Sequence, residues 1–221
     1  MKLLIEALVK FGCGFVMVGL LVFLPAGTLQ YANGWLLMWL LFLPMLIAGF
    51  VMLAKAPDFL KKRLDVKEKQ GTQKGVVALS GLMFIAGFVV AGLDYRFSWS
   101  YMPSWVVIAA AVLFLIAYAL YAEVMRENAY LSRTIKVEEG QTVVDTGLYG
   151  IVRHPMYSVT ILLFTMIPLI LGSWYALIVF AFYPAIIMTR LKDEEELLTR
   201  ELPGYAEYKE KVKYRLIPFI W

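Results

Sequence analysis

The sequence predicts an all-α integral membrane protein with about six transmembrane helices, including a C-terminal helical hairpin, and with additional amphipathic helices on the cytoplasmic side. The first observation is composition: 61% of the 221 residues are hydrophobic, 17% are charged, and the mean hydropathy is +0.72. Soluble domains contain roughly 45–50% apolar and about 25% charged residues. The second observation is that the apolar residues gather in stretches long enough to cross a bilayer.

The same composition excludes several classes of protein. An ordinary soluble enzyme and a disordered chain are excluded by the apolar excess. The single cysteine, Cys13, excludes a disulfide framework and a zinc site built from several thiolates. The single histidine, His154, excludes a histidine-rich metal site, so we expect no metal.

Six apolar stretches are candidate spans. Four lie in the N-terminal part, at 11–25, 35–54, 76–93 and 105–122. Two shorter stretches, 157–171 and 174–188, meet at a predicted tight turn and form the hairpin. Each has 15 residues and covers about 22 Å, less than the roughly 30 Å hydrocarbon core. The hairpin is therefore expected to use flanking residues, thin the bilayer or pack mainly against protein.

Basic residues predict the orientation. With both termini inside, every Lys and Arg except Arg96 lies on the cytoplasmic side, as the positive-inside rule requires. This placement explains the formal net charge of +4, so we expect the lipid bilayer as a partner and no nucleic acid.

The chain divides into two predicted regions. Residues 1–125 form a four-helix transmembrane region with a cytoplasmic connection at 55–75, where Pro57-Asp58 begins a helix that lies on anionic lipid. Residues 126–221 contain a loop, the helical hairpin 157–190 and C-terminal cytoplasmic helices that are interrupted at Pro203-Gly204. In the loop, 134–137 and 142–144 have β-like sequences, and a loop of this length is often functional.

Two polar clusters flank the hairpin. Arg153, His154 and Tyr157 lie at its start, where free helix N-terminal amides are expected to help receive an anion. Glu194 and Glu195 lie one or two turns beyond its exit. Because the two ends of an antiparallel hairpin are neighbours, we expect the clusters to face each other. Together they would hold a zwitterion, with Arg and His on a carboxylate and Glu on an amine or hydroxyls.

Each cluster also has an ordinary structural interpretation. Arg153 fits a positive-inside anchor, and His154 fits an interfacial residue bonded to backbone. The acidic run fits a solvated helix face. Other chemistry is excluded more firmly, because the sequence has no glycine-rich dinucleotide fingerprint, no P-loop, no nucleophile elbow and no alternating βα pattern.

The order of the motifs carries a family resemblance. The motifs are Gly140-Gln141-x-Val143-Val144-x-x-Gly147-x-Tyr149, Arg153-His154-Pro155-Met156-Tyr157, a hydrophobic hairpin, Glu194-Glu195-x-x-Leu198, and Leu202-Pro203-Gly204-Tyr205-x-x-Tyr208 with Val212, Arg215 and Pro218 after it. In this order they resemble the isoprenylcysteine carboxyl methyltransferase family, over roughly residues 127–221. One position departs from the family pattern, since Val159 stands where members often have glycine.

The resemblance implies that 126–221 is a cofactor-binding catalytic region. The implied cofactor is S-adenosylmethionine, with S-adenosylhomocysteine as product, and the implied acceptor is a lipophilic or prenylated molecule that enters from the lipid. The implied cofactor-binding residues are Tyr149, Arg153, His154, Pro155, Tyr157, Glu194, Glu195, Tyr205 and Tyr208. The predicted catalytic residues are Arg153, Glu195 and Arg215: an arginine would offset the charge of a carboxylate acceptor, and Glu194 or Glu195 would serve as base for a thiol or amine.

Two alternatives stand beside the methyltransferase. One is an NADPH-dependent membrane reductase of related architecture. The other is a non-catalytic membrane or transport protein, against which the nearly charge-free span middles argue. The chemical identity of the methyl acceptor and the oligomeric state do not follow from the sequence.

Overall fold

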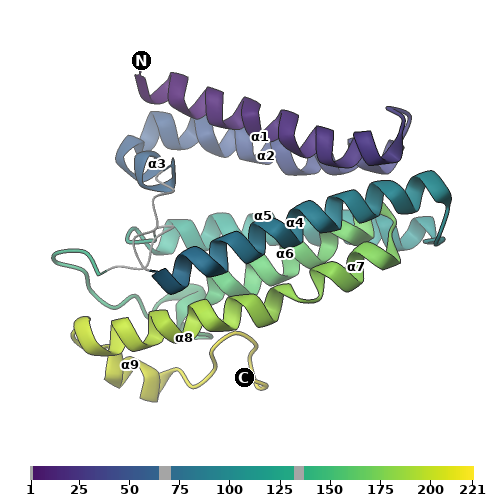
Figure 1. The fold of residues 1–221 in the computed structure, drawn as a ribbon. Helices are drawn as coiled ribbons and strands as arrows, with labels where there is room; N and C mark the ends of the chain where they lie inside the picture. The colour runs from purple at the N-terminus through teal and green to yellow at the C-terminus, as the bar shows by residue number, and fades with distance from the viewer. Residues whose placement is uncertain (1, 65–70, 132–136) are drawn as a thin grey trace.

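The computed structural model describes residues 2–64, 71–131 and 137–221, and its regular structure there is helical throughout (Figure 1). The helices are α1 (Lys2–Ala26), α2 (Ala32–Lys55), α3 (Pro57–Leu64), α4 (Gly71–Phe97), α5 (Ser104–Glu127), the 3₁₀ turn η1 (Gly147–Gly150), α6 (Pro155–Leu171), α7 (Trp174–Phe180), α8 (Tyr183–Glu201) and α9 (Tyr205–Lys211). The all-α membrane fold predicted from the sequence is confirmed.

Five helical segments within these ranges are long and apolar enough to cross a membrane: α1, α2, residues 74–97 of α4, α5, and the segment Trp174–Glu201 that contains α7 and α8. The sixth predicted span, α6, has 17 residues and covers about 25 Å, so it is shorter than these five. Each of the four N-terminal predicted spans lies inside a longer helix, because helix continues into the flanking residues that the apolar stretches left out.

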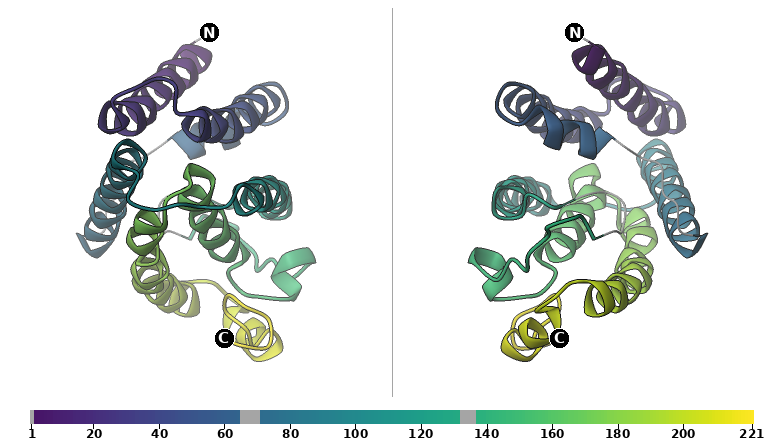
Figure 2. Two further views of the ribbon diagram at one scale, coloured as in Figure 1. Left: turned by 90° about the vertical axis from the view of Figure 1, so that its right-hand side faces the viewer. Right: turned by 90° about the vertical axis from the view of Figure 1, so that its left-hand side faces the viewer.

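Helix α6 lies in the middle of the bundle (Figure 2). It packs against α5 most extensively, and also against α2, α4, α7 and α8. Its buried side chains are correspondingly numerous and include Leu163, Ile167 and Ile170. The short helix therefore meets protein around most of its surface, which is one of the solutions expected for a hairpin too short for the bilayer.

The turn between α6 and α7 is built from residues suited to it. Gly172 ends α6 with φ +78°, a left-handed conformation that favours glycine, and Ser173 caps α7 by accepting a hydrogen bond from the Ala176 amide at 3.0 Å. Ser173 also donates to the buried Asp94 of α4 at 2.5 Å, and Tyr31 donates to the Leu171 carbonyl at 2.5 Å. We call this end of the bundle the turn end.

The second leg of the hairpin is longer than predicted and is not continuous. The expected hairpin covered 157–190, whereas the first leg begins at Pro155 and the second continues to Glu201. The second leg breaks at 181–182, just before Tyr183-Pro184 starts α8, because a proline has no amide hydrogen to continue the hydrogen bonds of α7. The predicted interruption at Pro203-Gly204 is confirmed, with α8 and α9 on either side of it.

Two predictions for the polar connections had different outcomes. The helix expected to begin at Pro57 is present as α3, although helix resumes at Gly71, before the end of the predicted connection 55–75. The β-like expectation for 142–144 is wrong, since these residues have no regular structure; residues 134–136 of the other β-like segment lie outside the described ranges.

Candidate functional site

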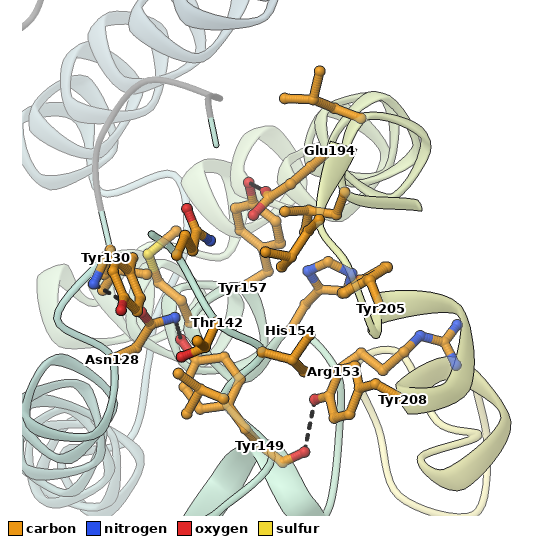
Figure 3. A pocket seen from close by; sticks show the side chains of 18 of the residues that line it. Asn128, Tyr130, Thr142, Tyr149, Arg153, His154, Tyr157, Glu194, Tyr205 and Tyr208 are labelled. Atoms are coloured by element: carbon orange, nitrogen blue, oxygen red, sulfur yellow. Dashed lines mark hydrogen bonds between the residues drawn. The ribbon is translucent and has the colours of Figure 1, made fainter. Parts of the chain in front are cut away.

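A small cavity lies at the end of the bundle opposite the turn end (Figure 3). We call this end, where Figure 1 shows α9, the α9 end. Its volume is about 90 Å³. The walls come from the loop after α5, from η1, from the start of α6, from the last turns of α8 and from α9. Polar side chains in the lining include Asn128, Gln141, His154, Tyr157, Glu194 and Tyr205, while Leu197, Leu198 and Leu202 supply apolar surface.

Arg153 holds the C-terminal tail against the end of α8. Its Nε donates to Glu195 at 2.6 Å, and its Nη1 donates to the backbone carbonyls of Val212 at 2.8 Å and Lys213 at 2.9 Å. The side chain is only 7% exposed, and in Figure 3 it runs from the start of α6 toward α9. One buried guanidinium therefore joins three parts of the chain that are far apart in sequence.

Glu195 receives cations on both of its oxygens. Arg153 and the His154 Nε2 lie at 2.6 and 3.3 Å from Oε1, and the Arg215 Nε donates to Oε2 at 3.0 Å. A buried carboxylate is tolerated only when it is paired and hydrogen-bonded in this way. Neither Glu195 nor Arg215 lines the cavity, whereas their partners Arg153 and His154 do, so the ion cluster forms part of the wall and supports it from behind.

Glu194 is the acidic side chain in the cavity lining among the described residues. The Tyr157 hydroxyl donates to its Oε2, and the Arg190 Nε in turn donates to the Tyr157 hydroxyl at 3.1 Å. Arg190 is buried, and Figure 3 shows Glu194 and Tyr157 pointing toward each other. This chain of hydrogen bonds fixes the direction of a negatively charged group at the cavity surface.

Helix α9 closes the cavity through a second, smaller core. This core consists of Leu202, Tyr205, Tyr208 and Val212. Loop residues such as Val143 pack against it. The Tyr208 hydroxyl donates to the Tyr149 carbonyl at 2.7 Å. The loop that precedes the hairpin is thereby attached to the helix that follows it.

Tyr205 differs from its neighbours in one respect. It is only 4% exposed, yet its hydroxyl has no hydrogen-bond partner within residues 2–64, 71–131 and 137–221. Burial, reinforced by the negative charges of Glu195 and Glu194, raises the pKa of this hydroxyl well above its ordinary value. It therefore stays protonated at neutral pH and is available to donate a hydrogen bond.

Most backbone amides around the start of α6 already have acceptors, contrary to the expectation of free amides for an anion. The amides of Arg153 and His154 donate to the carbonyls of Tyr214 and Arg215, each at 2.9 Å, and the Tyr157 amide donates to the His154 carbonyl at 3.0 Å. Pro155 has no amide hydrogen to offer. The returning C-terminal tail thus uses two amides that the sequence left without a partner.

Gly147 allows the loop to approach the end of α5. Its φ is +53°, and a Cβ built there would lie 2.7 Å from the Glu127 carboxyl carbon. Glu127 also accepts a hydrogen bond from Thr146 at 2.7 Å. The glycine therefore lets η1 begin directly against α5, which places Tyr149 where Asn128 donates to its hydroxyl at 3.0 Å.

The structure brings the predicted clusters together, since both ends of the hairpin meet in the ion cluster and in the Tyr157–Glu194 hydrogen bond. Of the predicted site residues, those in the cavity lining are Tyr149, Arg153, His154, Tyr157, Glu194, Tyr205 and Tyr208. Pro155 begins α6 and, like Glu195 and Arg215, is outside the lining. The lining residues Asn128, Gln141 and Arg190 were not among the predicted site residues. Gln141 belongs to the first family-like motif, so the sequence did contain a signal for it. Nothing in the sequence distinguished Arg190 from other basic residues that follow a span.

No group of three or more His, Cys, Asp or Glu side chains in the described part of the chain is placed to hold a metal ion. The chemical groups at the α9 end are instead a buried ion cluster, one oriented carboxylate and one unpartnered phenol. These groups suit hydrogen bonding to an organic ligand with both polar and apolar parts.

Comparison with known proteins gives two findings. An uncharacterized protein of Bacillus subtilis (strain 168), YpbQ, is 29% identical over 96 residues, which cover 43% of this chain and 57% of that relative. Residues 109–200 match the model of the isoprenylcysteine carboxyl methyltransferase (ICMT) family, a range that includes most of α5, all of α6 and α7, and most of α8. The resemblance read from the ordered motifs is thereby confirmed: this segment of the chain matches the ICMT family.

Proposed function

We propose that this integral membrane protein is an S-adenosylmethionine-dependent methyltransferase that acts on a lipophilic acceptor, with its cofactor bound in the cavity at the α9 end. One observation carries the proposal: in a single cavity, the fold joins loop and hairpin residues that lie inside the family match to residues of α9, which follows the matched segment. We also propose that the α9 end faces the cytoplasm, as the distribution of basic residues favours.

The donor set fits this cofactor. Glu194 presents an oriented carboxylate that would accept hydrogen bonds from the ammonium group or the ribose hydroxyls. The unpartnered Tyr205 hydroxyl would donate one, and such an orphaned buried group is the kind that a bound ligand satisfies. The leucines of α8 would cover an apolar face and exclude water.

The volume adds a requirement. Ligand pockets usually measure roughly 300–1,000 Å³, so a cavity of about 90 Å³ holds only part of such a cofactor. Binding therefore requires the walls to separate. Within the ion cluster, Glu195 and Arg215 lie behind the lining, and their bonds would hold Arg153, α8 and the tail together while other lining residues move.

When bound, the cofactor would supply an electrophilic methyl group on a sulfonium ion. The chain's residues must then align the acceptor with that methyl group and keep water away. A carboxylate acceptor needs no base, whereas a thiol or amine acceptor does; Glu194, which lines the cavity, is better placed for this role than Glu195. We assign Glu195, Arg153 and Arg215 a positioning role, since their charged groups bond to one another.

The decisive experiment is calorimetry on the full chain in nanodiscs with S-adenosylmethionine, S-adenosylhomocysteine and NADPH as separate ligands. We expect micromolar binding of the first two. Glu194→Gln should weaken that binding at least tenfold, because the amide no longer offers a charged acceptor. Glu196→Gln is the matched control: its side chain is exposed, it lies two positions further along α8, and it should bind as the wild type does.

The other outcomes separate the alternatives. Binding of NADPH alone would replace the proposal with the membrane reductase. A folded sample that binds none of the three ligands would favour the non-catalytic membrane protein. Equal losses in the two variants would assign the effect to the charge of α8 and not to a contact inside the cavity.

A further inference from the structure

The C-terminal residues form a closed turn with an apolar tip. The Trp221 carbonyl accepts hydrogen bonds from the amides of Leu216 at 3.0 Å and Ile217 at 3.1 Å, and the Trp221 amide donates to the Ile217 carbonyl at 3.1 Å. Phe219 stands at the bend with φ +66°. We call residues 216–221 the C-terminal hook. Its backbone is held by hydrogen bonds, so its shape is specific.

The hook exposes its apolar side chains. Ile217 is 51% exposed, Ile220 76% and Phe219 87%, the last being the most exposed large hydrophobic side chain among the described residues. An aromatic and two branched aliphatic side chains within four consecutive positions would be costly to leave in water. Some apolar surroundings must therefore cover the tip.

The attachment of the hook shows which surroundings are available. Ser158, in the first turn of α6, donates to the Leu216 carbonyl at 2.6 Å, and Leu216 itself is buried. Trp221 packs against the main hydrophobic core, and the Arg215 guanidinium lies 5.2 Å from the centre of its ring. Figure 1 shows the chain turning back from α9 so that its end lies beside α8, within the length of the bundle. The tip is thus level with helices that enter the bilayer.

The charges nearby match a membrane surface. The α9 segment and the residues before the hook carry four basic side chains. Lys211 is paired with Asp145 and Arg215 with Glu195, whereas Lys209 and Lys213 form no ion pair among the described residues. Basic residues next to an apolar, aromatic tip favour an interface with anionic lipid, where the ring enters the acyl boundary and the cations stay near the headgroups.

We propose that the C-terminal hook inserts Phe219, Ile217 and Ile220 into the bilayer leaflet at the α9 end and anchors the tail there. The anchored tail is the one whose carbonyls bond to the amides of Arg153 and His154 and whose Arg215 reaches Glu195. The membrane is therefore a structural partner of the ion cluster. This inference does not depend on the proposed methyltransferase activity.

The test is the depth of a nitroxide label in nanodiscs of phosphatidylcholine and phosphatidylglycerol. The full chain carries Cys13→Ser to remove its single cysteine, and one cysteine is then introduced at a time. Phe219→Cys and Ile220→Cys report on the hook. Leu20→Cys, on an exposed position of the apolar helix α1, is the bilayer reference, and Glu207→Cys, on the exposed side of α9, is the water reference.

We expect labels at both hook positions to be more accessible to oxygen than to a water-soluble nickel chelate, with a ratio several times that at Glu207→Cys and near that at Leu20→Cys. A ratio equal to that at Glu207→Cys would overturn the proposal, because the hook would then lie in water. Exclusion of both reagents would also overturn it, since a second copy of the chain, and not lipid, would then cover the tip.

Discussion

Helix α6 is held at both ends by buried polar side chains, and the two ends use them differently. At the turn end, Asp94 accepts hydrogen bonds from Ser173 at 2.5 Å and from the Ser100 hydroxyl at 2.7 Å. At the α9 end, Glu195 is bonded just as fully, but a cavity with the unpartnered Tyr205 hydroxyl lies in front of it. A satisfied buried network indicates structure, whereas a satisfied network behind an orphaned donor indicates a ligand site.

The comparison is tested most strongly by Arg153→Ala. The change removes the guanidinium from a buried carboxylate and leaves the carbonyls of Val212 and Lys213 without their donor. Breaking a buried ion pair by removing one partner costs about 3–5 kcal/mol. We expect a lower unfolding temperature in nanodiscs and loss of cofactor binding together.

Arg153→Lys is the control for that variant. Lysine keeps the charge but cannot reproduce the several directed hydrogen bonds of the guanidinium. Arg153→Lys should recover part of the lost stability. It should recover little of the order of the C-terminal tail, so trypsin should still cleave after Lys213 faster than in the wild type. A variant Arg153→Ala as stable as the wild type would contradict the view that this cluster holds the tail.

The second prediction concerns the turn end. Asp94→Ala removes the acceptor for Ser173 and Ser100 and leaves polar groups unsatisfied, which costs about 1–3 kcal/mol. Because the cavity lies at the other end of α6, the affinity for S-adenosylhomocysteine, measured by calorimetry below the unfolding transition, should not change. A tenfold loss of affinity would show that the two ends are coupled and would break the comparison.

The sequence predicted the structure of the turn end more completely than that of the α9 end. Gly172 and Ser173 predict a turn because of their own backbone preferences. The hydropathy of the flanking stretches alone predicts the helices on either side of that turn. The sequence also predicted that Arg153 and Glu195 face each other, because the two ends of a hairpin must be neighbours. These features depend on local sequence or on simple connectivity.

The remaining features depend on contacts across the fold. No local pattern shows that the tail returns to use the amides of Arg153 and His154, nor that Glu195 lies behind the lining while Glu194 lies in it. Adjacent residues on a helix point about 100° apart, so only one of the two carboxylates can face the cavity directly. The motif Glu194-Glu195 does not show which of them does. Only the packing of α8 against α6 and α9 separates them.

A third prediction tests how the loop reaches the cavity. Gly147→Ala places a Cβ 2.7 Å from the Glu127 carboxyl and forces a non-glycine residue to adopt φ +53°. The conformational part alone costs about 1–2 kcal/mol. Gly140→Ala is the matched control, since its φ is +72° but nothing lies within 4 Å of the added carbon. Thermal unfolding should show a larger loss for Gly147→Ala, and equal losses would exclude the contact with α5 as the reason for the glycine.

The smallest effects distinguish the two tyrosines of α9. Tyr208→Phe removes the hydrogen bond to the Tyr149 carbonyl and should cost about 1 kcal/mol of stability. Tyr205→Phe removes a hydroxyl that has no partner among the described residues, so stability without ligand should stay the same or rise slightly. Both variants keep the ring and therefore the packing of the small core.

Ligand binding should reverse that order. If the Tyr205 hydroxyl is free in order to meet the cofactor, Tyr205→Phe should weaken S-adenosylhomocysteine binding about tenfold, the effect of losing a hydrogen bond of about 1.4 kcal/mol, while Tyr208→Phe should change it little. The two variants thus distinguish a structural role for the Tyr208 hydroxyl from a ligand-binding role for the Tyr205 hydroxyl. Should Tyr205→Phe destabilise the free protein as much as Tyr208→Phe, the hydroxyl must already have a partner, and the contrast between the two ends of α6 would lose its main support.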